Sequence, residues 1–211
     1  MNGDSDEEKW LQHLQAGGQT ALAELFARHR DRLRRMVAWR LDPRLRGRLD
    51  PSDVLQEVYL DAARRLPAFL ERPNLAVGLW LRLLTGRRLL ELHRQHLGAQ
   101  MRAAGQEISL QAPDWAWASA PSLAMQLVGH LTSPSRAAAR AEIAARLTQA
   151  LEEMDAIDRE VLILRHFDEL SNNEVATLLG LQKAAASNRY VRALRRLREI
   201  LKSTPGLSDH L

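Results

Sequence analysis

The chain has 211 residues, of which 45% are hydrophobic and 27% charged, with a net charge of +4 and no cysteine. Its length allows one large or two small domains, and its composition is typical of a globular protein. The lack of cysteine excludes disulfides and thiolate catalysis, and no apolar run is long enough to cross a bilayer. The N-terminus also lacks the pattern of a secretory signal, so we expect a cytoplasmic protein without a membrane partner.

Three amphipathic helices are predicted in the first half of the chain. Apolar residues recur at intervals of three and four between residues 20 and 41, so one face of a helix there should be buried. Asp50 can cap a second helix that carries Pro51 in its first turn. A third helix is expected over residues 75–97. It is apolar on nearly two sides and should be the most buried of the three.

The second predicted helix carries a continuous polar ridge. Its members are Asp53, Gln56, Glu57 and Asp61. Paired carboxylates can act as acid and base, but neither a nucleophile nor a set of metal ligands lies nearby in the sequence. Acidic residues in the first turns also complement the helix dipole. A docking surface for a basic partner helix is the third interpretation that these residues leave open.

The third predicted helix combines one tryptophan with several arginines. These residues are Trp80, Arg82, Arg87, Arg88 and Arg94. Such a helix can present a rim to single-stranded nucleic acid, because aromatic stacking and cations cooperate in binding unpaired bases. In the alternative interpretation Trp80 anchors the core and the arginines extend to solvent.

Two histidines, His93 and His96, lie three residues apart on the same predicted helix. No carboxylate or cysteine ligand accompanies them in the sequence, so neither a metal site nor another cofactor is expected.

Helix-breaking residues become frequent in the middle of the chain. Glycine and proline interrupt the helical pattern repeatedly up to residue 134. We therefore predict an N-terminal domain over residues 1–105, a linker over 106–136 and a C-terminal domain over 137–211. The linker contains Trp115 and Trp117, whose exposure would be costly, so the segment is expected to lie against a domain or a partner.

The C-terminal domain is predicted to hold four short helices around one core, the last two forming a helix-turn-helix. Ser171 and Glu174 have the spacing of a capping box, and Gly180 supplies the left-handed corner that ends the first helix of the pair. A second helix runs from about Lys183 and buries one apolar stripe.

The opposite face of this last helix is rich in arginine. Asn188, Arg192 and Arg195 point away from the apolar stripe, and Arg189 flanks it. In a DNA-binding helix-turn-helix the second helix lies in the major groove, where asparagine can read a base and arginine can read guanine or neutralise phosphate. A solvated helical hairpin is the alternative. The capping box, the glycine corner and the arginine-rich helix together favour DNA binding.

The two halves of the chain together resemble bacterial RNA polymerase sigma factors of the compact extracytoplasmic-function (ECF) type. The stretch from Asp50 to Asp61, DPSDVLQEVYLD, is similar to the D-x-x-D-x-x-Q-E-x-F stretch of the family's region 2. The stretch from Trp80 to Arg88, WLRLLTGRR, is similar to its W-L-x-x-I-A-R-N segment. The residues from Asp158 to Phe167, the turn around Ser171 and Gly180, and Ser187 to Arg189 follow the order and spacing of region 4.

The resemblance implies an all-α fold of two small helical domains and a linker, with no catalytic residue. It implies docking on the clamp helices of the polymerase's largest subunit through Asp53, Gln56, Glu57 and Asp61. It implies opening and reading of the promoter −10 element near Trp80, Arg82, Arg87, Arg88 and Arg94. Readout of the −35 element is implied for Lys183, Ser187, Asn188, Arg189, Arg192 and Arg195, and the flap of the second-largest subunit is implied as a contact of this domain. An anti-sigma protein is a further candidate partner.

We therefore expect a transcription initiation factor that binds core RNA polymerase and directs it to promoters by recognising −35 and −10 elements. The alternative is a stand-alone helix-turn-helix regulator with a helical sensor domain. Changes at Gln56 and Glu57 distinguish the two, because only the first function needs polymerase binding. An enzyme is not expected, because the sequence offers no metal cluster, phosphate-binding glycine loop or nucleophile–base pair.

Overall fold

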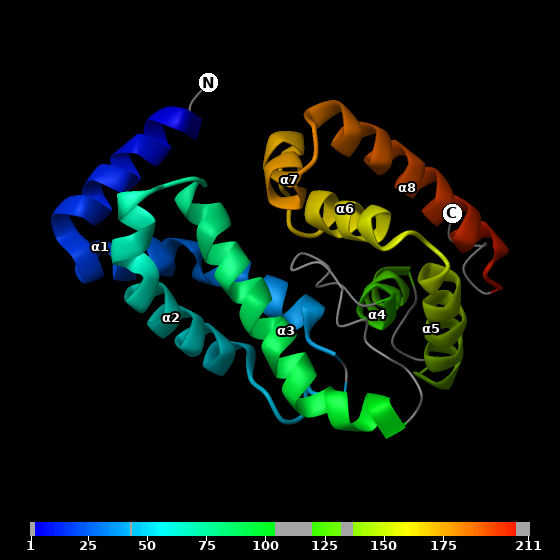
Figure 1. Cartoon of the computed structure of the whole chain (residues 1–211). Helices are drawn as coiled ribbons and strands as arrows, with labels where there is room; N and C mark the ends of the chain where they lie inside the picture. Colours follow the sequence, from blue (N-terminus) through cyan, green and yellow to red (C-terminus); the bar gives the residue numbers. More distant parts are fainter. Residues whose placement is uncertain (1–2, 43, 104–119, 132–136, 206–211) are drawn as a thin grey trace. The chain divides into compact units, whose positions relative to one another are not determined.

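The computed structural model describes residues 3–42, 44–103, 120–131 and 137–205. In these ranges every regular element is an α-helix, which confirms the all-α prediction (Figure 1). The helices are α1 (Gly3–Arg40), α2 (Pro51–Glu71), α3 (Val77–Ala103), α4 (Ala120–Leu131), α5 (Ala137–Glu152), α6 (Ala156–His166), α7 (Asn172–Leu179) and α8 (Lys183–Ser203).

The helices divide into two compact units. Unit 1 comprises Met1–Ala38 and Arg46–Gln106, and unit 2 comprises Trp39–Leu45 and Glu107–Leu211. Unit 1 therefore contains α1 up to its last turn, α2 and α3, whereas unit 2 contains α4 to α8.

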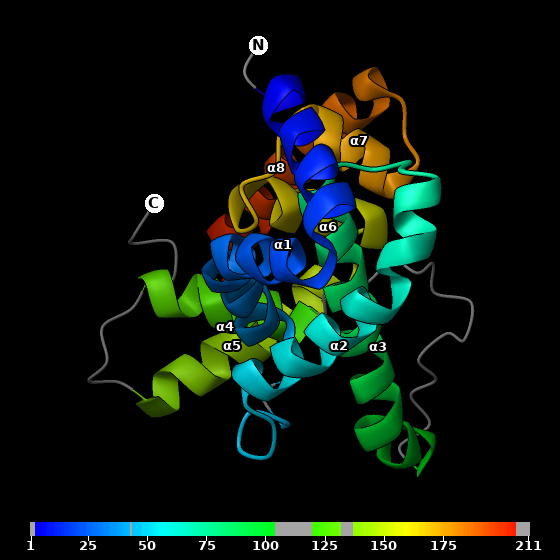
Figure 2. The same cartoon turned by 90° about the vertical axis from the view of Figure 1, so that its left-hand side faces the viewer.

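Unit 1 begins with a helix that is bent. The two parts of α1 meet at Gly18, whose φ of 52° and ψ of −122° interrupt the helix, and Figures 1 and 2 both show a sharp angle there. Only the second part, from about residue 20, was predicted. The first part is fixed in unit 1 by Leu14, which is fully buried. Glycine suits this bend because it adopts a positive φ at little cost.

The start of α2 confirms the predicted cap. The Asp50 carboxylate accepts a hydrogen bond from the Ser52 amide at 2.6 Å, and Pro51 occupies the first helical position. The apolar face of α2 is buried in the core of unit 1, and its members are Val54, Leu55, Val58, Ala62, Leu66 and Phe69. Because this face is inward, the polar ridge of the same helix is turned to solvent.

Unit 2 contains a helix that was not predicted. The interval expected to be a linker contains α4, whose Leu123, Ala124 and Val128 belong to the same core as Leu147 and Leu162. Pro121 had argued against a helix here, but it lies in the first turn of α4, where proline costs no hydrogen bond. Trp115 and Trp117 lie outside the described residues.

Unit 2 also buries charge. The guanidinium of Arg40 contacts the carboxylates of Glu160 and Asp168 at 2.8 and 2.7 Å, and all three side chains are buried. Beside them the rings of Trp39 and Phe167 lie 4.2 Å apart. Trp39 and Arg40, at the end of α1, therefore pack within unit 2. Removing the Arg40 cation would leave two buried carboxylates unpaired.

The helix-turn-helix follows the predicted pattern. The Ser171 hydroxyl accepts a hydrogen bond from the Glu174 amide, and the Glu174 carboxylate accepts one from the Ser171 amide at 2.7 Å. Gly180 ends α7 with a φ of 64° and a ψ of 30°. The Asn172 side chain donates to the Lys183 carbonyl oxygen at 2.9 Å and so joins the start of α7 to the start of α8.

We predict that Gly180→Ala lowers the free energy of unfolding of unit 2 by about 1–2 kcal/mol, because an L-residue is strained in the left-handed conformation. No atom lies within 4 Å of the added methyl group, so the change measures backbone strain alone. Gly47→Ala is the matched control, since its methyl group is equally unobstructed but no positive φ is imposed. Urea unfolding followed by circular dichroism measures both; an equal effect at the two positions contradicts the prediction.

Candidate nucleic-acid interface

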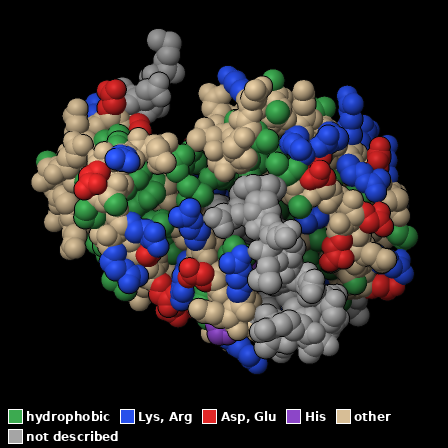
Figure 3. All heavy atoms as spheres, viewed as in Figure 1, with side chains coloured by type: hydrophobic (Ala, Val, Ile, Leu, Met, Phe, Trp, Pro, Cys, Tyr) green, Lys and Arg blue, Asp and Glu red, His purple; other side chains and the backbone are tan. Residues whose placement is uncertain are grey.

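The first half of α8 presents a basic and polar face to solvent. Ala186 and Ala193 bury the opposite face. Of the residues predicted to contact duplex DNA, Arg189 is half-buried and the others are exposed, namely Lys183, Ser187, Asn188, Arg192 and Arg195. Figure 3 shows Lys and Arg side chains gathered along the edge of unit 2 where Figure 1 places α8. The structure therefore brings all six predicted residues together on one helix.

Two of these arginines are held by a carboxylate on α6. Asp158 is only 3% exposed, and it accepts hydrogen bonds from Arg189 at 2.8 Å and from Arg192 at 2.6 and 2.8 Å. Burial alone would raise the pKa of Asp158, but the hydrogen bonds from Arg192 and Arg189 hold it below its usual value. Sequence reasoning did not identify Asp158 as a partner of α8, because the residues are more than thirty positions apart.

The polar ridge of α2 lies at the surface of unit 1, as predicted. Asp53, Gln56 and Glu57 are exposed, and Asp61 is half-buried. Asp61 pairs within its own helix with Arg65 at 2.8 Å and with Arg64 at 3.6 Å. These carboxylates thus form a charged surface, and the interpretation as an acid–base pair has no support from a neighbouring nucleophile in the described residues.

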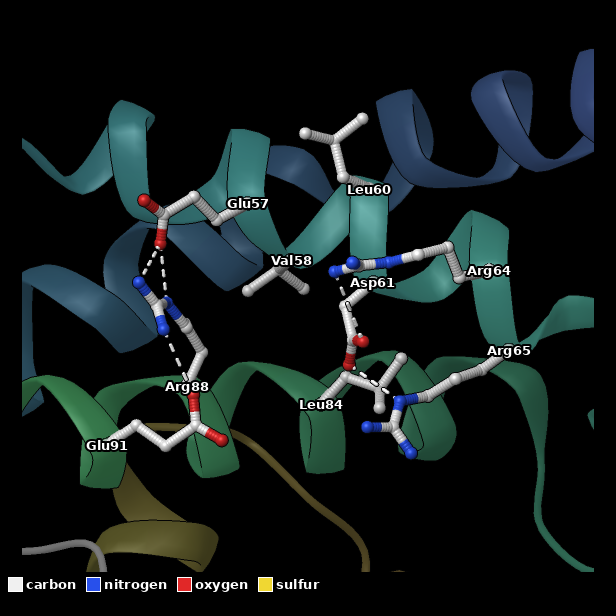
Figure 4. A pocket seen from close by; sticks show the side chains of 9 residues that line it. All are labelled: Glu57, Val58, Leu60, Asp61, Arg64, Arg65, Leu84, Arg88 and Glu91. Carbon is white, nitrogen blue, oxygen red and sulfur yellow. Dashed lines mark hydrogen bonds and ion pairs between the residues drawn. The ribbon is translucent and has the colours of Figure 1, made fainter.

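A shallow pocket lies between this ridge and α3 (Figure 4). Arg88 of α3 reaches across to the Glu57 carboxylate and also pairs with Glu91 at 3.0 Å. Val58 and Leu84 lie between this charged cluster and the Asp61 cluster. Leu60, which sequence reasoning missed, is 59% exposed at the same pocket.

A second pocket lies where α2 ends and α3 begins. It is lined by two of the predicted residues, Trp80 and Arg87, and by three that sequence reasoning missed, Arg65, Arg72 and Asn74. The sequence signal for Arg72 and Asn74 is the proline-bounded connection after α2, which leads directly into the helix that was predicted to bind single-stranded nucleic acid. The arginines give this pocket a positive rim that suits a polyanion.

The predicted roles of Trp80, Arg82 and Arg94 are modified by the structure. Trp80 is 8% exposed and stacks on Phe69, with ring centroids 4.3 Å apart, so it supports the floor of the pocket. Arg82 is 3% exposed, and its guanidinium is inside unit 1 rather than on the surface where the prediction placed it. The prediction included Arg82 because it is one of the arginines that interrupt an apolar helix, within the stretch that resembles the family's −10 segment. Arg94 is exposed but does not line the pocket.

Two contacts fix the start of α3 beside this pocket. The Glu7 carboxylate accepts a hydrogen bond from the Val77 amide, the first of α3. The ring of His29 packs against Gly78, where an added methyl carbon would lie 3.0 Å from the imidazole. Burial, with smaller contributions from Arg32 and Arg28, lowers the pKa of His29 below its usual value. The neutral imidazole is therefore the form that packs against α3.

Within the described ranges, no three His, Asp or Glu side chains come together as a metal site would require. None of the described helices has the length and apolarity needed to span a bilayer.

Comparison with known proteins identifies the helix-turn-helix unit. Residues 144–197, which run from α5 into α8, match the family described as sigma-70, region 4. This match lies on the helix-turn-helix and agrees with the resemblance to sigma factors that the sequence predicts. Region 4 is the part of a sigma factor that recognises the promoter −35 element, which agrees with the exposed basic face of α8.

The fold of this chain has a solved counterpart. It is similar to CnrH, whose structure was determined in complex with the cytosolic domain of CnrY, with a TM-score of 0.55. The similarity covers 93% of this chain and 97% of CnrH at 20% sequence identity, so it shows a shared fold that extends beyond region 4. No curated protein sequence matches this chain significantly.

We predict that the protein loses stability as the pH falls below about 6.5, the ordinary pKa of histidine. The folded state binds a proton at His29 less readily than the unfolded state. The contribution of neutral His29 to the free energy of unfolding is therefore complete above that pH and is lost as the pH falls towards the lowered pKa. Thermal unfolding between pH 5 and 8 measures the effect. His29→Gln should flatten the pH dependence, whereas His96→Gln, at an exposed position on α3, should retain it.

Proposed function

We propose that this chain is a sigma factor of the ECF type, which binds core RNA polymerase through unit 1 and directs it to promoters by contacting a −35 and a −10 element. The observation that carries the proposal is the recognition helix α8, which exposes Asn188, Arg192 and Arg195 within a region 4 domain. Sigma factors act by binding rather than by catalysis. The proposed function therefore consists of binding steps, each of which depends on the affinity of one surface for DNA or for polymerase.

The −35 element is the proposed ligand of α8. A recognition helix places its N-terminal residues against base edges in the major groove. Here those residues are Lys183, Ser187 and Asn188, all exposed. Arg195 lies farther along α8 and has no ion-pair partner among the residues that the structure describes, which suits a phosphate contact. Such contacts position the helix but carry no sequence information.

The −10 element is the proposed ligand of the pocket between the end of α2 and the start of α3. Arg65, Arg72 and Arg87 line its rim, and Asn74 offers both a donor and an acceptor to a base edge. Arginine can neutralise phosphate and stack on an unpaired base, so this lining suits a single strand better than a duplex. Binding the separated strand would favour melting, because only the open form makes these contacts.

The polymerase is the proposed partner of the α2 ridge. Asp53, Gln56 and Glu57 present two carboxylates and an amide to solvent, and Leu60 adds an exposed apolar side chain on the same helix. This combination suits the clamp helices of the largest subunit. Region 4 would contact the flap of the second-largest subunit, so that the two units engage different parts of one enzyme. A cytoplasmic location follows from this proposal, because polymerase and chromosome are found there.

A regulatory protein is a further proposed partner. CnrH was solved with the cytosolic domain of CnrY bound, and this chain shares the fold of nearly all of CnrH. We therefore include an anti-sigma protein among the partners of this chain.

The proposed polymerase contact predicts a loss of function that spares DNA binding. Gln56→Ala combined with Glu57→Ala should weaken binding to core polymerase about tenfold or more, because truncating one side of a desolvated charged contact costs about 2–5 kcal/mol. Run-off transcription from genomic templates should fall in parallel. Both side chains are exposed, so the fold should survive. If the wild-type chain neither binds core polymerase nor directs any start site, the function is refuted; a stand-alone regulator would bind duplex DNA unchanged in both forms.

The proposed single-strand pocket predicts a separate defect in melting. Arg72→Ala with Arg87→Ala should slow open-complex formation and reduce the salt dependence of binding by about one counterion per lost phosphate contact. Fluorescence of a base analogue in the −10 element reports strand opening. Arg146→Ala, an exposed arginine of α5 paired only within its helix, is the matched control. A normal rate of opening in the double variant rules out this pocket as the binding site.

A further inference from the structure

Asp158 is a buried acid in the domain that contains the helix-turn-helix. Among the described residues, its ion-pair partners on α8 are two arginines that were predicted to bind DNA, Arg189 and Arg192. It lies in the first turn of α6, next to the capping residue Asp155. Asp155 adds a weaker contact with Arg189 at 3.6 Å. A carboxylate in this position opposes DNA by its charge, so its presence beside the recognition helix needs a physical reason.

The contact with Arg192 fixes the direction of its guanidinium. Nε of Arg192 donates to one carboxylate oxygen at 2.6 Å, and Nη2 donates to the other at 2.8 Å. A two-point contact of this kind restrains rotation of the guanidinium plane far more than a single hydrogen bond would. The side chain is nevertheless 60% exposed, so the end of the guanidinium that Asp158 does not use remains open to solvent.

The contact also decides which side of α8 the two arginines occupy. Because both are bonded to α6, they lie on the flank of α8 that faces this helix. Ser187 and Asn188 are exposed without an ion pair or side-chain hydrogen bond among the described residues. In a helix-turn-helix the second helix enters the groove and the first crosses the DNA backbone. Because α6 packs against both of these helices, the flank of α8 that faces α6 is directed towards the edge of the groove, where the phosphates lie.

We propose that Asp158 is a positioning residue of the DNA interface, which orients Arg189 and Arg192 as a phosphate-contacting pair and leaves base reading to Ser187 and Asn188. This inference rests on the proposed −35 recognition by α8 and states which residues of α8 contact phosphates and which contact bases. Asp158 offsets one of the two positive charges, so the pair contributes orientation rather than a large non-specific attraction for DNA.

The test uses the full chain assembled with core polymerase and a fluorescent duplex that carries a promoter mapped by run-off transcription. Binding is measured at low temperature, where the strands stay closed, against the same duplex with a scrambled −35 element and at several salt concentrations. Arg192→Ala should weaken binding to both duplexes alike and reduce the salt slope by about 1. Asn188→Ala should weaken only the promoter complex, by about 5- to 150-fold, with the slope unchanged.

Asp158→Asn then reports the positioning role. It should weaken promoter binding by about tenfold in the otherwise wild-type chain, the order expected for loss of an oriented charged contact. It should have little effect in a chain that already carries Arg189→Ala and Arg192→Ala, because a residue that acts through its partners has nothing left to orient. Equal effects in the two backgrounds would mean a purely structural role and would overturn the inference.

If Asp158→Asn does not fold, a second variant tests the same proposal. Arg192→Lys retains the cation but cannot meet the carboxylate with two parallel N–H groups. It should bind DNA nearly as weakly as Arg192→Ala; binding like the wild type would show that charge alone matters and would overturn the inference. A change of base preference in Arg192→Ala would also overturn it. Failure of the wild-type chain to prefer the intact −35 element would instead refute the proposed function.

Discussion

The neutralisation of buried carboxylates is the constraint on which unit 2 depends. Asp158, Glu160 and Asp168 are all withdrawn from water in or just after α6, and an unpaired charge there would cost several kcal/mol. Each meets an arginine from outside α6. Asp158 meets α8, while Glu160 and Asp168 meet Arg40. The helix that precedes the helix-turn-helix is thus held in place by ion pairs as well as by apolar packing. The pairs made by Asp158 also restrain the guanidinium groups of Arg189 and Arg192.

Local signals in the sequence were sufficient for the helix-turn-helix. A capping box, a glycine corner and an apolar stripe each act over a few residues, so the residue types at Ser171, Glu174 and Gly180 determine the geometry directly. The same holds for the Asp50 cap and the buried face of α2. These are positions where local preference and tertiary structure agree, which is the condition for reading a fold from its sequence.

What the sequence could not supply were relations between distant residues. Arg82 and Arg87 look alike in the sequence, and only packing shows that the first is buried and the second exposed. Because proline and glycine are frequent around α4, the sequence did not predict this helix. Its stability comes from burial against α5 rather than from helical propensity. The pairing of Asp158 with α8 and the contribution of Arg72 and Asn74 to the pocket likewise depend on tertiary contacts that periodicity does not encode.

Arg88 belongs to α3, and its guanidinium is shared between Glu57 of the α2 ridge and Glu91. A partner that captured the Glu57 carboxylate would leave this cation with one counter-charge fewer, and so more strongly attracted to a phosphate. The converse must hold to the same degree, since linkage between two ligands is reciprocal. If the α2 ridge binds polymerase and α3 binds DNA, as we propose, Arg88 would couple the two sites, so that occupancy of one would alter the affinity of the other.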